Sequence, residues 1–415
     1  MVDRSAASTP LPSSESLRLL GLEMGLSAVG VTTADILEPG RVTLHQRKAG
    51  GLPGEMQFTY RNPDRSTEPR RRMPSARSLV VAALAYGSDA TPGAGSAPAP
   101  GPPVDPLASA GRIARYMWSD HYRRLESMLD RLAEPLRAAG YQAQVILDSN
   151  HLVDRNVAWR AGLGWYGKNT NILLPGVGSW HVLGSILTDA PLDPTGEPLP
   201  DGCGPCRQCM DDCPTNAIIA PGVVDARRCI AWLVQAAEPI PVELRSAVGD
   251  RIYGCDDCQE VCPPNRAAAA RSEAVETRAD VGWLLTAADE AILARHGRWY
   301  IAHRDVDVIR RTALVVLGNT AEPSWGTDRI ARLLRPHLTG DRAMTRNHAV
   351  WAARRLGLAA SSRTGGRSVI ELPVCCRGLD RVSDNPACPD PGLHRELTVP
   401  VRARYRAEAW LEIAR

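Results

Sequence analysis

A cysteine pattern constrains this chain more than any other feature of its sequence. Eight cysteines lie in the stretch from Cys203 to Cys262, and the first four follow the spacing C-x2-C-x2-C-x3-C directly before Pro214. In bacterial ferredoxins this run binds 4Fe-4S clusters: three thiolates cap one cube, and the fourth ligates the neighbouring cluster. The spacing therefore predicts two clusters and a second group of ligands further along the chain.

The second group is present, because the last three of the eight cysteines are spaced C-x2-C-x3-C and Pro263 follows them. The exchange of the fourth ligand between neighbouring clusters then predicts two sets. The first cysteine set comprises Cys203, Cys206, Cys209 and Cys262, and the second cysteine set comprises Cys213, Cys229, Cys255 and Cys258. Two tetrahedral zinc sites could also use eight cysteines, but the spacing and the two Cys-Pro endings favour iron–sulfur clusters.

Composition places the chain among ordinary globular proteins. Its 415 residues predict two or three domains, and 44% hydrophobic with 23% charged residues exclude a wholly disordered protein and a membrane protein. No apolar run reaches eighteen residues and the first thirty residues lack an export signal, so we expect a cytoplasmic protein without a membrane anchor. In that reducing compartment, clustered cysteines indicate metal binding rather than disulfides.

The amino-terminal half predicts an α/β layer. Ser13 or Ser14 can cap a helix over Leu17, Leu20 and Met24, and short apolar runs predict strands. The expected strands are 28–32, 78–86, 143–147 and 182–187, and a further helix is expected at 122–139. The segment 88–106 is dense in proline and glycine, and we expect a disordered loop there.

The carboxyl-terminal half predicts helices. Similar Leu-Gly endings at Leu317 and Leu356 stand 39 residues apart (356 − 317), near the period of paired-helix HEAT repeats, although two unrelated helices would give the same weak signal. The three remaining cysteines fall in a segment that we expect to be a poorly packed tail, and we assign them no function. The expected domains are 1–195, an α/β domain; 196–270, the cluster domain; 271–358, the helical repeats; and 359–415, the tail.

A candidate catalytic acid, Asp148, directly follows the strand expected at 143–147. It begins a glycine-rich segment with polar and aromatic residues that is typical of a buried cofactor edge. Open α/β sheets bind ligands at the carboxyl ends of their strands, so Asp148 could act as a general acid there if burial raises its pKa. Alternatively, Asp148 and Ser149 cap the helix expected at 152–161.

Two other features of this segment have competing interpretations. Asp154 competes for the acid role, but an ion pair with Arg155 or Arg160 on the helix surface is favoured. Three glycines from Gly162 onward match G-x-G-x-x-G, but they follow a helix rather than a strand, which argues against a dinucleotide site. The next polar residues either hydrogen-bond a large cofactor or form a surface loop: Lys168, Asn169 and Asn171.

Taken together, these motifs resemble the epoxyqueuosine reductases, the cobalamin-dependent iron–sulfur enzymes of queuosine synthesis in tRNA. The stretches that carry the resemblance lie in the family's order within residues 14–357: LDSNHLVDRNVAWRAGLGWYGKNTNIL, GSWHVLGSILTD, CGPCRQCMDDCPTNAI, RRCI and YGCDDCQEVCP. The resemblance implies an α/β cobalamin-binding domain like that of reductive dehalogenases, a ferredoxin-like domain with two 4Fe-4S clusters, and all-α HEAT-like repeats that help to hold tRNA.

The resemblance also assigns roles to single residues. The family's proton donor falls on Asp148, which decides between its two interpretations. The cofactor-binding residues implied in the same way are Arg115, Lys168, Asn169, Asn171, Ile172, Gly178, Ser179 and Ala231. The chain departs from the family pattern at Ala231, where a serine is usual, and at His121-Tyr122-Arg123, where Asp-Tyr-His is common.

The reaction that the resemblance implies is the reduction of a tRNA-borne epoxide to give queuosine. An external one-electron donor of the flavodoxin or ferredoxin type supplies the clusters, the clusters reduce cobalamin, and Asp148 protonates the departing oxygen. We expect a monomer that holds tRNA through residues 309–357, where nine arginines stand against three acids although the whole chain has a net charge of only +3. An ordinary solvated helical surface would give the same charge count.

Two other functions share parts of this pattern. A reductive dehalogenase of small organohalides would also use cobalamin and two clusters, but the missing export signal and the helical repeats favour the tRNA enzyme. A non-enzymatic electron carrier would need only the two clusters, which leaves the segment from Asp148 to Asp189 without a purpose.

Overall fold

The computed structural model describes residues 10–86, 110–266 and 276–358. The chain divides into two compact units, Met1–Val316 and Leu317–Arg415. The expected loop at 88–106 and the expected tail at 359–415 lie outside the described residues.

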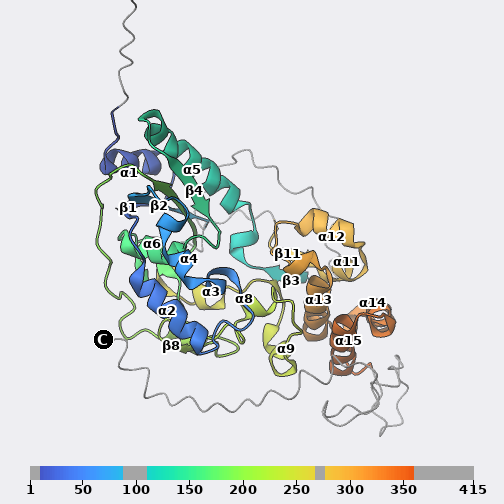
Figure 1. Cartoon of the computed structure of the whole chain (residues 1–415). Coiled ribbons are helices and arrows are strands. Elements are labelled where there is room, and N and C mark those ends of the chain that lie inside the picture. Colours follow the sequence, from blue (N-terminus) through green and yellow to red (C-terminus); the bar gives the residue numbers. More distant parts are fainter. Residues whose placement is uncertain (1–9, 87–109, 267–275, 359–415) are drawn as a thin grey trace, which may run out of the picture. The chain divides into compact units, whose positions relative to one another are not determined.

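The larger unit is built on a four-stranded sheet in the order β1-β2-β7-β4 (Figure 1). Its strands are β1 (Ala28–Thr33), β2 (Ser78–Ala85), β7 (His181–Thr188) and β4 (Ala143–Leu147). Every neighbouring pair is antiparallel, and Val80 of β2 lies between Val31 of β1 and Ile186 of β7. The apolar run of β2 forms a central strand because its side chains are buried on both faces of the sheet.

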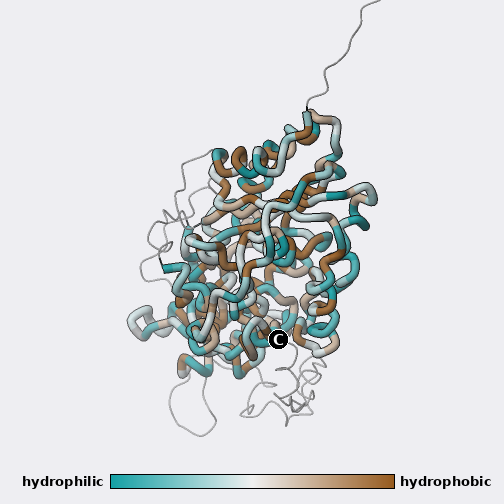
Figure 2. Tube along the Cα trace, turned by 90° about the vertical axis from the view of Figure 1, so that its left-hand side faces the viewer, coloured by the Kyte–Doolittle hydropathy of each residue, from teal (hydrophilic) through white to brown (hydrophobic). Residues whose placement is uncertain are grey.

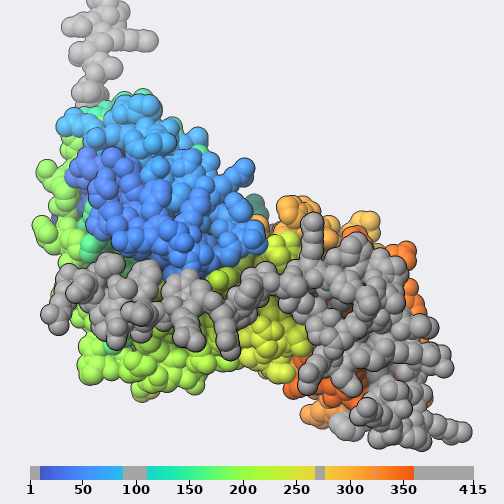
Figure 3. Space-filling model, turned by 60° about the horizontal axis from the view of Figure 1, so that its bottom comes forward, coloured from blue at the N-terminus to red at the C-terminus, as the bar shows by residue number. Residues whose placement is uncertain are grey.

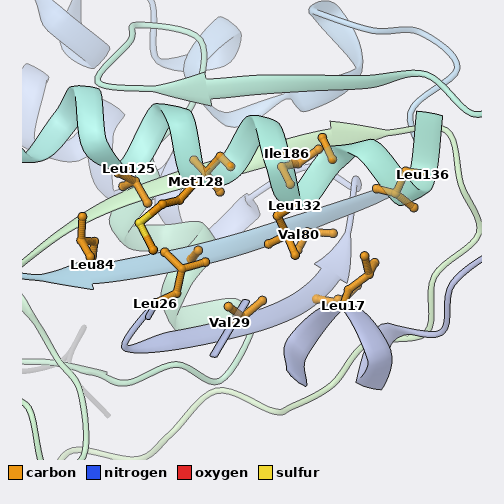
Figure 4. Close-up of a cluster of buried hydrophobic side chains, with 14 of the residues drawn as sticks. Leu17, Leu26, Val29, Val80, Leu84, Leu125, Met128, Leu132, Leu136 and Ile186 are labelled. Carbon is orange, nitrogen blue, oxygen red and sulfur yellow. The ribbon is translucent and has the colours of Figure 1, made fainter. Parts of the chain in front are cut away.

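Two helices cover one face of this sheet, α1 (Ser14–Glu23) and α5 (His121–Ala138). Apolar residues recur at helical spacing along α5 and point into the sheet (Figure 4). Gly184 of β7 lets α5 approach closely, because a Cβ atom there would lie 2.7 Å from the side chain of Leu129. This core includes Leu17, Val29, Val31, Val80, Leu125, Leu129, Leu132, Leu136 and Ile186.

The opposite face of the sheet is covered by α6 (Asp154–Arg160), which packs Val157 and Ala158 against inward residues of β2. Figure 2 shows hydrophobic and hydrophilic residues alternating along helical turns, as expected of helices with one buried side. The remaining helices before β4 are α2 (Glu38–Ala49), α3 (Phe58–Arg61), α4 (Pro63–Thr67), and the 3-10 turns η1 (Pro69–Arg71) and η2 (Arg115–Met117). The hairpin between α6 and β7 is formed by β5 (Trp165–Tyr166) and β6 (Ile172–Leu173).

The segment 203–265, called here the cysteine segment, contains only short helices and strands. Helices this short are not stable in isolation. Hydrogen bonds join it to the amino-terminal residues: Arg47 donates to the carbonyl of Gly222 at 2.6 Å, and the backbone nitrogen of Ala226 donates to the carbonyl of Leu52 at 2.9 Å. Figure 3 shows the blue amino-terminal surface next to the green surface of this segment. Its elements are α7 (Gln208–Asp211), β8 (Ile218–Ala220), β9 (Val223–Val224), α8 (Ile230–Leu233), α9 (Val242–Val248), β10 (Arg251–Tyr253), α10 (Asp257–Glu260) and η3 (Pro263–Asn265).

A second sheet joins distant parts of the larger unit in the order β10-β3-β11. It takes one strand from each of the first three expected domains, since β3 is Ala110–Ile113 and β11 is Arg278–Asp280. Arg112 of β3 reinforces this junction with ion pairs to Asp250, Asp257 and Glu260. The helices that follow are α11 (Val281–Thr286), α12 (Asp289–His296), η5 (Ala302–Arg304) and α13 (Asp307–Thr320).

The smaller unit contains a packed pair of helices, α14 (Thr327–Thr339) and α15 (Ala343–Arg355), after the short turn η6 (Pro323–Trp325). Both helices bury apolar side chains, with Leu334 and Ala349 fully enclosed. Gly318 of the first expected Leu-Gly ending lies inside α13, whereas Leu356 follows α15, and the HEAT-like assignment stays a prediction. Among the described residues, no helix combines the length and hydropathy needed to cross a bilayer.

The sequence patterns predicted the sheet closely, since each expected strand agrees with an observed strand to within one residue at either end. One argument was wrong. The expectation that Asp148 lies at a ligand-binding edge rests on a rule for open parallel sheets, whereas this sheet is antiparallel throughout. The position of Asp148 therefore needs an explanation from its own surroundings.

The packing of α5 on the sheet gives a stability prediction. Leu129 is fully buried, so Leu129→Ala removes apolar contacts, leaves a cavity and lowers the free energy of unfolding by about 2–5 kcal/mol. Denaturant midpoints measured by circular dichroism would report this change. Leu19→Ala is the control, because Leu19 is 48% exposed and its loss should change stability by less than about 0.5 kcal/mol. Equal effects of the two substitutions would contradict the packing.

Candidate active site

The predicted site residues meet around a cavity of about 610 Å³. Its walls come from α2 and α3, the loop after β4, the segment between α6 and β7, and the cysteine segment. Its volume lies within the range of about 300–1,000 Å³ that is usual for ligand and cofactor sites. Six of the predicted residues line the cavity: Asp148, Asn169, Asn171, Ile172, Ser179 and Ala231.

The second cysteine set borders this cavity with all four of its members: Cys213, Cys229, Cys255 and Cys258. No member of the first cysteine set lines the cavity. Cys262 lies near the first set although it is distant in sequence: burial, together with the nearby thiols of Cys203, Cys209 and Cys206, raises the pKa of its thiol to about 11. Cys262 thus lies near thiols of the first set, and the exchange of ligands between the two clusters stays a prediction.

The geometry of the cysteines differs from that of a zinc site. All eight are free thiols. Within the described ranges, no three His, Cys, Asp or Glu side chains converge on a point where they could hold one metal ion. A tetrahedral zinc site requires that convergence, whereas the thiolates of a 4Fe-4S cube bind separate irons. The donor set fits the clusters better than zinc.

Asp148 directly follows β4 and projects into the cavity. Its φ of 42° places the backbone in the left-handed region, which residues other than glycine adopt rarely and often at functional sites. The side chain is open to the cavity, yet partial desolvation by the surrounding protein raises the pKa of its carboxyl. A raised pKa keeps the proton on the carboxyl to higher pH, as a general acid requires.

The alternative role of Asp148 as a helix cap is wrong. The residue that precedes α6 is Val153, and no side chain caps this helix. Ser149 also does not reach α6, because its hydroxyl accepts a hydrogen bond from the backbone nitrogen of His151 at 3.3 Å. Asp148 is therefore available to the cavity.

The surface ion pair expected for Asp154 is also absent. Arg160 donates to backbone carbonyls at and beyond the end of β1, and Arg155 donates to a loop carbonyl at 3.4 Å. Asp154 instead lines the cavity, where its Oδ1 atom is shielded from solvent and has no hydrogen-bond partner. Burial and the negative charge of Asp148 together raise the pKa of Asp154 to about 8.

Two residues predicted to bind the cofactor, Lys168 and Asn169, join the α/β part to the cysteine segment. The ammonium group of Lys168 donates to the carbonyls of Gly204 at 2.6 Å and Cys206 at 2.9 Å, and Lys168 does not line the cavity. The side-chain amide of Asn169 donates to the carbonyl of Cys258 at 3.2 Å. This loop therefore holds the backbone of both cysteine sets.

A second junction is formed by Gly178 and Ser179. The side-chain oxygen of Asn265 accepts from the backbone nitrogen of Ser179 at 2.6 Å, and its amide donates to the Ser179 hydroxyl at 2.9 Å. That hydroxyl donates to the side-chain oxygen of Gln259 at 2.9 Å. Gly178 has a φ of 77°, and a Cβ atom there would lie 2.0 Å from Asn265, so only glycine fits.

Arg115 does not line the cavity. Its guanidinium carbon is 5.0 Å from the ring centre of Trp118 and 4.8 Å from that of Trp180, in cation–π geometry. Its backbone nitrogen donates to the carboxylate of Asp256 at 2.7 Å. Arg115 thus supports the loop that carries Cys255 rather than contacting the cavity.

Several cavity residues received no role from the sequence. Tyr86, Tyr116 and Tyr122 line it, and Gln235 donates to the hydroxyl of Tyr116 at 3.1 Å. His181 also lines it with an Nδ1 atom that is shielded and has no hydrogen-bond partner, and burial lowers the pKa of its imidazole to about 3. Tyr122 and His181 lie within recognised motifs, but nothing in their spacing indicates that they face the same space.

Comparisons with known proteins agree with this geometry. A family model described as a 4Fe-4S double cluster binding domain matches residues 202–265, which include all eight clustered cysteines. The epoxyqueuosine reductase of Xanthomonas campestris pv. campestris is 34% identical over 376 residues, which cover 84% of this chain and 98% of that protein. The epoxyqueuosine reductase of Staphylococcus aureus is 30% identical over 79% of this chain and 85% of its own length.

Solved structures give the same result. An epoxyqueuosine reductase structure from Bacillus subtilis matches with a TM-score of 0.70 and 28% identity, over 82% of this chain and 90% of that chain. A structure of an epoxyqueuosine reductase with an epoxyqueuosine-modified tRNA-Tyr stem loop matches with a TM-score of 0.71 and 29% identity, over 83% and 90% of the two chains. With relatives this similar over most of its length, the chain belongs to the epoxyqueuosine reductase family of oxidoreductases.

Proposed function

We propose that this chain reduces epoxyqueuosine in tRNA to queuosine. The observation that carries the proposal is that a single cavity is bordered both by Asp148 and by all four members of the second cysteine set. A candidate proton donor and a candidate electron source therefore face the same space. The structure of a family member with a modified tRNA stem loop supports tRNA as the carrier of the substrate.

The two cysteine sets bind two 4Fe-4S clusters that form a path for single electrons. The match to a double cluster domain supports two clusters, and the position of the second set beside the cavity supports its role as the inner one. An external one-electron donor of the flavodoxin or ferredoxin type reduces the cluster of the first set. Lys168 and Asn169 stabilise both loops by binding carbonyls of Gly204, Cys206 and Cys258.

The cavity residues fit a large cofactor such as cobalamin. Asn171, Ile172 and Ala231 line the space with small, apolar and amide groups, and His181 leaves a shielded nitrogen without a partner there. We infer that these residues hold the cofactor, while Asn169 and Ser179 fix the loops around it. The chemistry expected of cobalamin in this cavity is delivery of two electrons to the epoxide carbon.

Asp148 supplies a proton to the oxygen of the epoxide. Conversion of an epoxide into an alkene and water breaks two C–O bonds and consumes two electrons and two protons. The raised pKa of Asp148 keeps its carboxyl protonated to higher pH, and its exposure to the cavity gives it access to the reacting oxygen. Activity should therefore fall as pH rises through the pKa of this group.

The smaller unit offers positive charge for the RNA phosphates. Its described part carries seven arginines against three acids, and four of these arginines are exposed: Arg332, Arg335, Arg342 and Arg355. Two of the nine arginines counted from the sequence do not contribute. Arg311 is fully buried and donates to the carbonyl of Leu233, and Arg310 pairs with Asp289.

Metal content tests the cofactor assignment. The reconstituted full-length protein should bind about eight irons and, after incubation with cobalamin and gel filtration, one cobalt per chain. Cys206→Ser and Cys258→Ser should each lose one cluster and keep about four irons, whereas Cys375→Ser, a thiol outside both sets, should keep eight. Eight irons without cobalt would contradict the cobalamin assignment and favour the electron carrier.

Substitution of the proton donor tests the catalytic assignment. Asp148→Asn keeps the size of the side chain but removes its proton, so turnover of epoxyqueuosine-modified tRNA should fall about 10²–10⁴-fold. Iron and cobalt contents should not change. Asp193→Asn, at an exposed carboxyl, is the matched control and should retain full turnover. Full turnover in Asp148→Asn would remove the assignment.

Salt dependence tests the RNA surface. The logarithm of the association constant for a modified anticodon stem loop should fall linearly with the logarithm of salt concentration, because bound phosphates release counterions. Arg332→Ala should weaken binding and reduce the slope by about one. Arg18→Ala, in an exposed ion pair of α1, is the control and should leave the slope unchanged. Binding that does not respond to salt would contradict this surface.

A further inference from the structure

The cavity holds a second carboxyl group that the proposed reaction has not yet used. Asp154 is the first residue of α6 and lines the same space as Asp148. Its side chain is half-buried, and its Oδ1 atom is shielded from solvent with no hydrogen-bond partner. A shielded carboxylate without a partner is costly, because an ion in a low-dielectric site needs a counter-charge or hydrogen bonds.

Among the described residues, no cation forms an ion pair with this carboxyl, although the charge of Arg155 lowers the pKa of Asp154 and so opposes the effect of burial. The titratable and charged groups around it are Asp148 after β4, Tyr122 on α5, Arg155 on α6 itself and His181 on β7. Arg155 directs its Nη1 atom to a loop carbonyl at 3.4 Å and is exposed. Burial keeps His181 neutral by lowering its pKa to about 3, and Tyr122 is neutral because burial raises its pKa.

The two carboxyl groups are electrostatically coupled. Burial and the charge of Asp148 together raise the pKa of Asp154 to about 8, although the charge of Arg155 lowers it. Two nearby acids in such a site share protons, and their titration belongs to the pair. The pair therefore retains a proton at neutral pH, and the shielded Asp154 is the member that holds it more strongly.

We propose that Asp154 is the proton reservoir of the site, which passes its proton to Asp148 as Asp148 protonates the epoxide oxygen. This inference rests on the proposed function. The reaction takes two electrons from the external donor and two protons, breaks two C–O bonds, forms one C=C bond and releases the oxygen as water. At neutral pH the pair holds one proton, which passes from Asp154 through Asp148 to the epoxide oxygen. Water in the cavity then reprotonates Asp154, and a second transfer along the same path supplies the second proton. Asp154 thus acts through Asp148.

The pH dependence of turnover tests this role. Wild-type turnover should fall above about pH 8, where the pair loses its last proton. In Asp154→Asn the decline of turnover at high pH should begin at least about one pH unit lower than in the wild type. Turnover of this variant at pH 8 should therefore be about tenfold lower than its turnover at pH 6. Asp154→Glu restores the carboxyl and should restore the wild-type pH profile, and the control Asp193→Asn should leave the profile unchanged. An unshifted pH profile in Asp154→Asn overturns the proposal.

A second measurement does not depend on activity. Infrared spectra of the full-length protein with its clusters, recorded before cobalamin is added, should show a protonated carboxyl band that disappears near pH 8. The band should be missing in Asp154→Asn and present in Asp193→Asn. Persistence of the band in Asp154→Asn overturns the proposal. Circular dichroism and iron content establish whether Asp154→Asn is folded; if it is not, a wild-type band lost well below pH 8 overturns the proposal instead.

The two variants separate this inference from the proposed function. Loss of turnover in Asp148→Asn with an unshifted pH profile in Asp154→Asn removes the reservoir and leaves the proton donor in place. Full turnover in Asp148→Asn removes the proton donor, and the reservoir fails with it even if the infrared band belongs to Asp154. If Asp154→Asn shifts the pH profile of turnover and also loses the infrared band, both the proton-donor role of Asp148 and the reservoir role of Asp154 are supported.

Discussion

The cavity depends on a few hydrogen bonds between one loop of the α/β part and the backbone of the cysteine segment. Lys168 and Asn169 bind carbonyls that lie 36 to 89 residues away in sequence, and Ser179 pairs with Asn265. The helices of the cysteine segment have four to seven residues, far below the length of about 12–15 at which isolated helices become stable. Their placement beside Asp148 therefore comes from these bonds rather than from local structure.

The choice of lysine at this junction has a physical reason. The chain carries 49 basic residues, and only Lys48 and Lys168 are lysines. Both donate to backbone carbonyls, Lys48 to that of Arg61 at 3.3 Å. A compact ammonium can reach two carbonyls of one tight loop, whereas the planar guanidinium of arginine suits carboxylates and phosphates. Lys168 thus serves assembly, whereas its neighbours Asn171 and Ile172 line the cavity.

Sequence patterns predicted what depends on local spacing and missed what depends on distant contacts. The strand Ala143–Leu147 follows from periodicity, and the structure has this strand. Spacing also groups Cys262 with the first cysteine set, near whose thiols it lies. Lys168 looked like a cofactor ligand because nothing in the sequence indicates a bond to a carbonyl 36 residues away. Asp154 looked like a surface residue because helical periodicity cannot show that the first turn of α6 opens into a cavity.

The charge balance of the cavity explains why neutral acids suit this site. Among the lining residues that the structure describes, the cations are Arg47 and Arg155, and both donate to backbone carbonyls instead of to a carboxylate. Asp148 and Asp154 therefore have no ion-pair partner; the charge of Arg155 lowers the pKa of Asp154, but burial outweighs it, and the tyrosines nearby stay protonated. A reaction that turns an epoxide oxygen into water needs donors that still hold their protons at neutral pH. Adding a cation next to Asp154 would lower its pKa and remove that property.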